Sequence, residues 1–197
     1  MMMYDERTIV YQGRPLFQVA KMRSPSSLNN ALNEVACFFY VLQGANQVID
    51  GNGLYRSDSK EGLLKSCGNF ISHYLPDEEI KSDFEAIVIF LYPDMLRDIY
   101  QDQLPKLSLH QGKAQPPKRV VGNELVEKFI DGLFIYFEHE ELMDEELAKL
   151  KVKELVMILL KSNYFEGVVE FFQGLFSPKA LSFREIVENN LLNPLNL

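Results

Sequence analysis

The order of apolar and polar residues along the chain changes character near residue 92. Before that point, short apolar runs rich in aromatic and β-branched residues are separated by clusters of Gly, Asn, Asp, Ser and Pro. Such runs between turn-forming clusters are typical of consecutive β-strands. We therefore expect roughly eight strands, at residues 8–12, 16–22, 35–42, 46–49, 54–57, 62–66, 70–74 and 86–92.

The connections in this half favour antiparallel pairing. The stretch QGANQVIDGNG, residues 43–53, places Asp50-Gly51 and Asn52-Gly53 beside a short expected strand. Both pairs readily adopt the positive φ angles of tight hairpin turns. Short antiparallel strands in this number cover their edges by closing or stacking into a jelly roll or small barrel, which is the fold we expect here.

Beyond residue 92 the apolar residues recur at helical spacing. YPDMLRDIYQDQL, residues 92–104, predicts a short helix, and the proline-rich stretch 105–120 indicates a linker. NELVEKFIDGLFIYF, residues 123–137, has one apolar face and one charged face. A further helix is expected after Asp144, whose side chain suits the N-cap position, so the last two helices form a hairpin.

The last predicted helix, EELAKLKVKELVMILLKSN at 145–163, is apolar over most of its circumference. One apolar arc suits the preceding helix and the barrel, and the remainder needs a second partner. We predict that a second copy of the chain packs there, giving a homodimer. The predicted contact residues are Leu147, Leu150, Lys151, Glu154 and Ile158. The alternative is that both arcs are buried within one monomer.

Charge and cysteine content narrow the function. The chain of 197 residues has 28 acidic and 20 basic side chains, a net charge of −8 and a pI near 5.0, so it is not expected to bind DNA by itself. Cys37 and Cys67 lack CxxC spacing and the start lacks a signal-peptide pattern, which favours a cytoplasmic protein. The longest apolar run, 86–92, is far shorter than the roughly 20 residues of a membrane-spanning helix.

Motifs for catalysis and metal binding are lacking in the sequence. Its three histidines, His73, His110 and His139, are far apart and form no HxH pair, whereas metal-binding jelly-roll enzymes use HxH with an acid and a later His. No GxSxG motif, phosphate-binding glycine loop or CxxC is present. We therefore expect no enzyme activity, no metal and no cofactor.

Three stretches carry a resemblance to a known family. FYVLQGANQVI at 39–49 with LLKSCGNFISH at 63–73 is similar to a vestigial cupin pattern, in which a strand ends in Gly and a later Gly precedes an apolar strand. LAKLKVKELVMILL at 147–160 resembles a linker helix of the form L-K-x-x-E-L-L-x-L-L, and FREIVENNLLNPLNL at 183–197 resembles the first helix of a helix-turn-helix region. Together they resemble the N-terminal regulatory half of AraC/XylS-family transcription regulators.

The resemblance implies an α+β fold, in which a cupin-like antiparallel β jelly roll or barrel precedes an α-helical hairpin for dimerisation. It divides the chain into a barrel at 1–104, a linker at 105–120, a helical dimerisation region at 121–176 and the truncated start of a helix-turn-helix domain at 177–197. Such a chain senses a signal and dimerises, and DNA is bound only through the helices that follow in the family.

The resemblance leaves the signal open between a small ligand and a partner protein, because different branches of the family use each. Candidates to bind a polar ligand in the barrel are Tyr40, Arg56, His73 and Tyr74. Alternatively, the neighbouring Phe38, Phe39, Phe70 and Ile71 fill the interior as core. The other function classes are a metal-free stand-alone binding module and a cupin-type enzyme.

Overall fold

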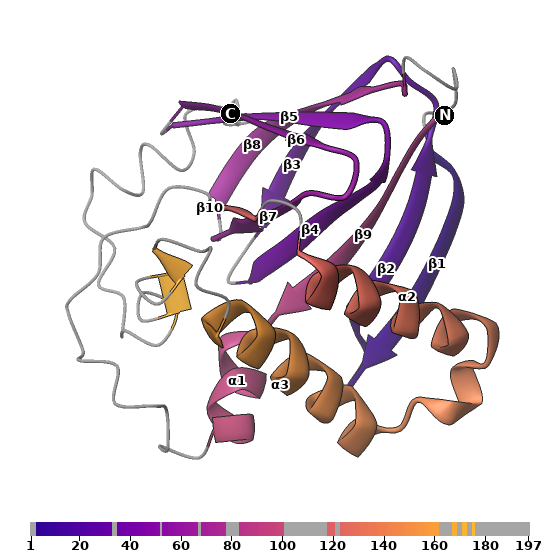
Figure 1. The fold of residues 1–197 in the computed structure, drawn as a ribbon, viewed down its shortest axis with the longest axis vertical. Helices are drawn as coiled ribbons and strands as arrows, with labels where there is room; N and C mark the ends of the chain where they lie inside the picture. Colours follow the sequence, from indigo (N-terminus) through magenta and orange to yellow (C-terminus); the bar gives the residue numbers. More distant parts are fainter. Residues whose placement is uncertain are drawn as a thin grey trace, which may run out of the picture.

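Two antiparallel β-sheets face each other, and helices cover the outer side of one of them (Figure 1). The computed structural model describes residues 3–32, 35–51, 53–66, 68–77, 83–100, 118–120, 123–161, 167–168, 171–172 and 175. Within these residues the fold is a two-sheet barrel followed by helices, which confirms the predicted α+β class.

The larger sheet has six strands within the described residues. In spatial order they are β1 (Met3–Tyr11), β2 (Arg14–Met22), β9 (Phe84–Leu91), β4 (Ala36–Gln43), β7 (Gly62–Lys65) and β10 (Lys118–Val120). The smaller sheet orders β3 (Ser26–Leu32), β8 (Gly68–Leu75), β5 (Ala45–Asp50) and β6 (Gly53–Asp58). All strand pairs are antiparallel.

The eight expected strands correspond to β1, β2 and β4 to β9. Asp50 pairs with Gly53 at the end of the β5–β6 hairpin, as the Asp-Gly and Asn-Gly pairs predict. Two observed strands were not expected. β3 has the largely polar sequence SSLNNAL, and β10 lies within the predicted linker, where it pairs with β7.

The helices begin where the sequence predicts. α1 is Pro93–Tyr100, α2 is Glu124–Glu138, and α3 is Glu145–Lys161, with a short 3-10 helix η1 at Glu140–Leu142. The side chain of Asn123 accepts a hydrogen bond from the Leu125 backbone N–H at 2.8 Å. Asp144 accepts one from the Leu147 N–H at 2.8 Å, as expected for an N-cap.

The central strands of the six-stranded sheet are buried on both faces. Along β4, Phe38 and Tyr40 belong to the core that includes the helices, whereas Cys37 and Phe39 point between the two sheets. The helix-side core also contains Phe17, Val19, Leu64, Ile87, Ile89, Val126, Phe129, Ile130, Leu133, Val152, Leu155 and Leu159. Strands buried on both faces have apolar residues at successive positions, which explains the continuous run ACFFYV in β4.

Polar contacts fix α1 against its neighbours. Arg14 of β2 pairs with Asp94 at 2.8 Å, and its guanidinium lies 4.1 Å from the centre of the Tyr92 ring. Lys149 of α3 pairs with Asp98 at 2.6 Å. These contacts connect the β1–β2 hairpin and α3 to the same short helix.

The Arg14–Asp94 pair predicts a small, pH-dependent effect. The hydrogen bond from Arg14 lowers the pKa of the Asp94 carboxyl below 3.8. A folded-state pKa below the unfolded value stabilises the protein above that value and loses the effect as the pH falls. We expect Asp94→Asn to lower the free energy of unfolding at neutral pH by less than about 1 kcal/mol, because both side chains are partly exposed to water.

Urea denaturation of Asp94→Asn and the unmodified chain, at neutral pH and in acid below pH 3.8, checks this prediction. The difference between the two proteins should shrink in acid. A difference of unchanged size would show that ionisation of Asp94 is not its source.

Candidate ligand site

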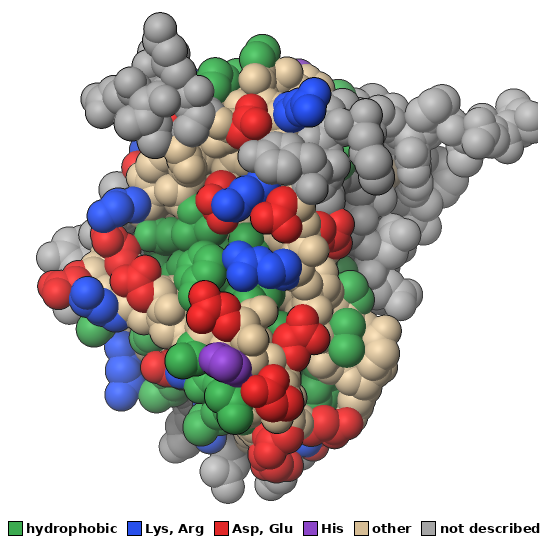
Figure 2. Space-filling view, turned by 90° about the vertical axis from the view of Figure 1, so that its right-hand side faces the viewer, with side chains coloured by type: hydrophobic (Ala, Val, Ile, Leu, Met, Phe, Trp, Pro, Cys, Tyr) green, Lys and Arg blue, Asp and Glu red, His purple; other side chains and the backbone are tan. Residues whose placement is uncertain are grey.

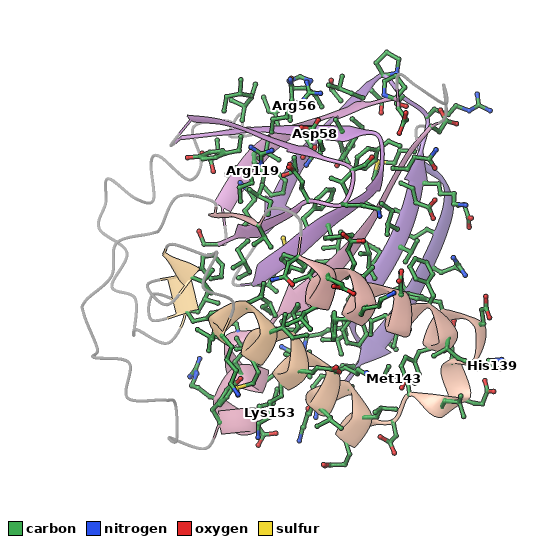
Figure 3. The ribbon with its side chains drawn as sticks, viewed as in Figure 1. Arg56, Asp58, Arg119, His139, Met143 and Lys153 are labelled. Carbon is green, nitrogen blue, oxygen red and sulfur yellow. The ribbon has the colours of Figure 1, made fainter. Side chains whose placement is uncertain are left out.

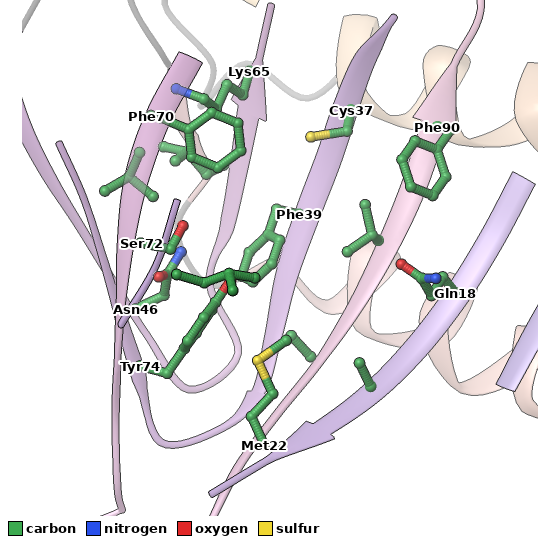
Figure 4. A pocket seen from close by; sticks show the side chains of 16 residues that line it. Gln18, Met22, Cys37, Phe39, Asn46, Lys65, Phe70, Ser72, Tyr74 and Phe90 are labelled. Atoms are coloured by element: carbon green, nitrogen blue, oxygen red, sulfur yellow. The ribbon is translucent and has the colours of Figure 1, made fainter. Parts of the chain in front are cut away.

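A cavity of about 250 Å³ lies between the two sheets. Its aromatic walls are Phe39, Phe70, Tyr74 and Phe90, and its polar side chains are Gln18, Asn46, Lys65 and Ser72 (Figure 4). An engineered protein cavity of about 150 Å³ already binds benzene. The space is therefore sufficient for a small organic molecule.

The lining follows from the alternation of side chains along each strand. Every second residue of β8 and β9 lines the cavity: Phe70, Ser72 and Tyr74 in β8, and Ala86, Val88 and Phe90 in β9. The residues between those of β9, Ile87 and Ile89, belong to the helix-side core. One sheet thus supplies a cavity wall on one face and a platform for the helices on the other.

Of the side chains that line the cavity in the described part of the chain, Lys65 is the charged one. Its Nζ lies 3.1 Å from Oδ2 of Asp50, and the two side chains are 5% and 10% exposed. The same Nζ lies 4.0 Å from the centre of the Phe70 ring. Lys65 belongs to β7 of the larger sheet and Asp50 to β5 of the smaller sheet, so this ion pair connects the sheets.

The ion pair stands at one end of the cavity. Figure 4 shows Lys65 and Phe70 at one end and Met22 at the other. Burial lowers the pKa of Lys65 below 10.5, and the neighbouring Asp50 carboxylate opposes that shift. Burial thus disfavours the charged form of Lys65, and the Asp50 carboxylate stabilises it.

A row of polar side chains crosses the inner face of the smaller sheet. Ser26, Tyr74, Asn46 and Ser57 are direct partners on four neighbouring strands. Oγ of Ser26, Oδ1 of Asn46 and Oγ of Ser57 are buried without a hydrogen-bond partner. Buried polar atoms are normally satisfied, by water where protein groups do not reach. Asn46 is the one of these three residues that lines the cavity.

Other chemistry at the site is limited. Cys37 lines the cavity, and burial raises the pKa of its thiol to about 12, so the reactive thiolate is disfavoured. The described residues contain no group of three or more His, Cys, Asp or Glu that suits a metal ion. Among the helices they form, none is long and apolar enough to cross a membrane.

Only Tyr74 of the four residues predicted to bind a ligand lines the cavity. Tyr40 faces the helices, where burial raises the pKa of its phenol and the charges of Glu127 and Asp131 add to the shift. The neighbouring position, Phe39, faces the cavity instead. The structure therefore places Tyr40 and Tyr74 in different cores.

Arg56 and His73 lie on the outer face of the smaller sheet. Arg56 pairs with Asp58 at 2.9 Å and is about half exposed, and Figure 3 shows Arg56 and Asp58 far from the helices. Nδ1 of His73 lies 2.6 Å from Oγ of Ser27. The sequence analysis did not predict Lys65, Asn46 and Ser72 as cavity residues. For Lys65, the one indication in the sequence was its place directly after the apolar residues of the short strand GLLK.

The predicted dimer contacts form a stripe along one side of α3, at spacings of three and four residues. Leu150 is 59% exposed, Glu154 is exposed, and Leu147, Lys151 and Ile158 are half-buried. Lys151 pairs with Glu154 at 2.9 Å. Toward the turn between α2 and α3, the side of the molecule shown in Figure 2 has many acidic side chains with apolar ones between them.

The fold and cavity together define a cupin-like domain with a helical hairpin on its larger sheet. Residues 36–171 match the model of the ExsA N-terminal regulatory domain. Since the match spans well over half of the chain, the chain belongs to this family of regulatory domains of AraC-type transcription regulators. No curated protein sequence matches the chain. The family predicted from the sequence is thereby confirmed.

Solved structures of ToxT from Vibrio cholerae have the same fold. ToxT bound to (E)-4-(8-methylnaphthalen-1-yl)but-3-enoic acid aligns with a TM-score of 0.52 and 17% identity, over 78% of this chain and 60% of ToxT. Wild-type ToxT bound to an unsaturated fatty acid aligns with a TM-score of 0.54 and 13% identity, over 90% of this chain and 63% of ToxT. The chain thus spans about three-fifths of the ToxT chains it matches.

Proposed function

We propose that this chain is the sensing and dimerising part of a bacterial transcription regulator. The observation that carries the proposal is the family match over residues 36–171. The matched residues include five of the strands that line the cavity, β4, β5, β7, β8 and β9, and the helices α2 and α3. Neither catalysis nor DNA binding is assigned to these residues. DNA is contacted by another part of the regulator, and the protein acts in the cytoplasm.

The cavity favours a small molecule as the signal over a partner protein. It lies between two sheets, is mostly apolar and contains a few polar side chains, which is the usual character of a small-molecule site. Two of the similar ToxT structures contain apolar carboxylic acids. The domain limits that we propose are the barrel at 1–104, the linker at 105–120, the helical region at 121–176 and the beginning of a DNA-binding domain at 177–197.

For dimerisation we propose the stripe of Leu147, Leu150, Lys151, Glu154 and Ile158 on α3. Leu150 is an exposed leucine on a helix whose opposite side is packed against the core. The charged pair Lys151–Glu154 borders it, an arrangement of apolar centre and charged flank that suits a helix-to-helix contact.

Leu150→Asp should weaken self-association more than tenfold, because it places a charge in the apolar centre of the proposed contact. Lys153→Asp is the matched control, since it puts the same side chain on an exposed position of the same helix. Sedimentation equilibrium over a range of micromolar concentrations measures the change.

Both variants should retain the circular dichroism and thermal transition of the unmodified chain. Dimers of unchanged affinity in Leu150→Asp would refute the proposed seam. An unmodified chain that stays monomeric over the same concentrations would refute the dimerising role itself.

A further inference from the structure

We propose that the cavity binds an apolar molecule carrying one carboxylate, and that this carboxylate replaces Asp50 as the partner of Lys65. The inference rests on the proposed sensing function and names its ligand class and its anchoring residue. Without ligand, the Asp50 carboxylate occupies the anion position beside Lys65. The ligand carboxylate displaces Asp50 from that position.

The walls determine the apolar part of the ligand. Met22, Phe39, Val48, Val88 and Phe90 line the cavity, and Phe39 and Val88 are direct partners on adjacent strands. Burying an apolar group against such walls contributes about 25 cal/mol for each Å² removed from water. A molecule with an aromatic ring or a short alkyl chain fits this environment better than a sugar.

The charge of Lys65 determines the polar part. Its side chain is 5% exposed, and a buried ammonium requires an anionic partner. A neutral ligand gains at most an ordinary hydrogen bond at this end, and a cationic ligand is repelled. An anion gains a charge-assisted hydrogen bond, provided that Asp50 gives up its place.

The Asp50 side chain can move out of the ion pair, whereas the position of Lys65 is fixed by its strand. Asp50 is the last residue of β5 and adjoins the exposed Gly51 in the β5–β6 turn, so rotation of its side chain brings the carboxylate into water. Lys65 is fixed in β7, paired with Cys37 of the central strand β4. Exchange of the anion therefore breaks the only side-chain ion pair that connects the two sheets at the cavity within the described residues.

Asn46 gives independent evidence of a built site. It is 1% exposed, lines the cavity and has an Oδ1 atom without a hydrogen-bond partner. Figure 4 shows it between Lys65 and Met22, along the length of the cavity. A donor on the ligand, or a water that enters with it, satisfies this oxygen.

The test compares three probes that share one apolar part: 4-phenylbutyrate, 4-phenylbutanol and 4-phenylbutylamine. Isothermal titration calorimetry on the 197-residue chain should show the acid binding at least about tenfold more tightly than the alcohol. The amine should bind more weakly than the alcohol. Equal affinity for all three would mean adsorption to apolar surface and would overturn the proposal.

Two variants identify the anchoring residues. Lys65→Met should abolish the preference for the acid over the alcohol. Asp50→Asn should tighten binding of the acid about tenfold and leave the alcohol unchanged, because the competing carboxylate is gone. Lys60→Met is the control, since Lys60 lies outside the cavity and pairs with Glu127 of α2. It should bind like the unmodified chain.

Folding and function are separated by further measurements. If Lys65→Met fails to fold, Asp50→Asn still tests the proposal. Binding of 4-phenylbutyrate to Asp50→Asn that is unchanged or weaker would refute the replacement of Asp50 by the ligand carboxylate. Ala86→Leu narrows the cavity and should reduce binding of both acid and alcohol. If no probe binds while Leu150→Asp still dissociates a dimer, the ligand inference fails and the dimerising function stands.

Discussion

Asp50→Ala lowers the free energy of unfolding by about 3 kcal/mol at neutral pH, because it leaves the Lys65 ammonium buried without an anion. The matched control is Asp58→Ala, which removes an aspartate at the end of the adjacent strand β6. Asp58 pairs with Arg56, but both side chains are about half exposed, so that loss is no more than about 1 kcal/mol. Chemical denaturation of the three proteins measures both values.

The double variant Asp50→Ala/Lys65→Met should recover most of the loss, since no charge then remains buried. If the double variant is as unstable as Asp50→Ala, the loss comes from the turn at Asp50 and not from the ion pair. The double variant therefore separates an effect on the turn from the loss of the counter-ion.

The cost of Asp50→Ala should also decrease in alkali. Burial lowers the folded-state pKa of Lys65 below its ordinary value of 10.5, and removal of Asp50 lowers it further. When the unfolded chain binds more protons than the folded chain, stability rises with pH. The difference between variant and unmodified chain should therefore shrink as the pH rises from neutral toward 10.5.

Gly62→Ala should lower the free energy of unfolding by about 3 kcal/mol, near the upper end of overpacking effects. Gly62 lies in β7, and a Cβ there would overlap the ring of Phe38. Phe38 is fully buried in the helix-side core, and Val120 of β10 occupies the other side at 3.4 Å. Neither neighbour has free space into which to move.

Gly132→Ala provides the control of opposite sign. Gly132 is an exposed residue of α2, and a Cβ there meets no atom within 4 Å. Alanine should stabilise that helix by up to about 1 kcal/mol. The rescue variant Gly62→Ala/Phe38→Leu should regain part of the loss in thermal denaturation. A Gly62→Ala protein as stable as the unmodified chain would mean that β7 does not lie against Phe38.

The strands and helices were predictable wherever apolar periodicity or turn chemistry is strong. The hairpin at Asp50 and the N-cap at Asp144 follow from local chemistry alone. β3 was not predictable because SSLNNAL lacks an apolar face, and its pairing with β8 supplies the structure. β10 was not predictable because three residues, KRV, give no period to detect.

The site was less predictable than the fold because it depends on which face of a strand is inside. In ACFFYVLQ both faces are buried, so alternation does not reveal that Phe39 faces the cavity and Tyr40 the helices. Lys65 resembles the polar end of an apolar strand. Its charge is paired with Asp50, a residue of the opposite sheet, and local sequence patterns do not reveal such long-range partners.

The larger sheet separates the cavity from the helices by a single layer of backbone. Phe39 touches the cavity, and its chain neighbours Phe38 and Tyr40 touch the helix-side core. If β4 shifts when a ligand enters the cavity, Phe38 and Tyr40 shift with Phe39, because one peptide bond joins each of them to it. The surface on which α2 and α3 pack then moves as well. Coupling between the cavity and the helices then needs no chain of intermediate side chains. We expect substitutions that make β4 more rigid to weaken this coupling, and loss of a distant side-chain contact to leave it unchanged.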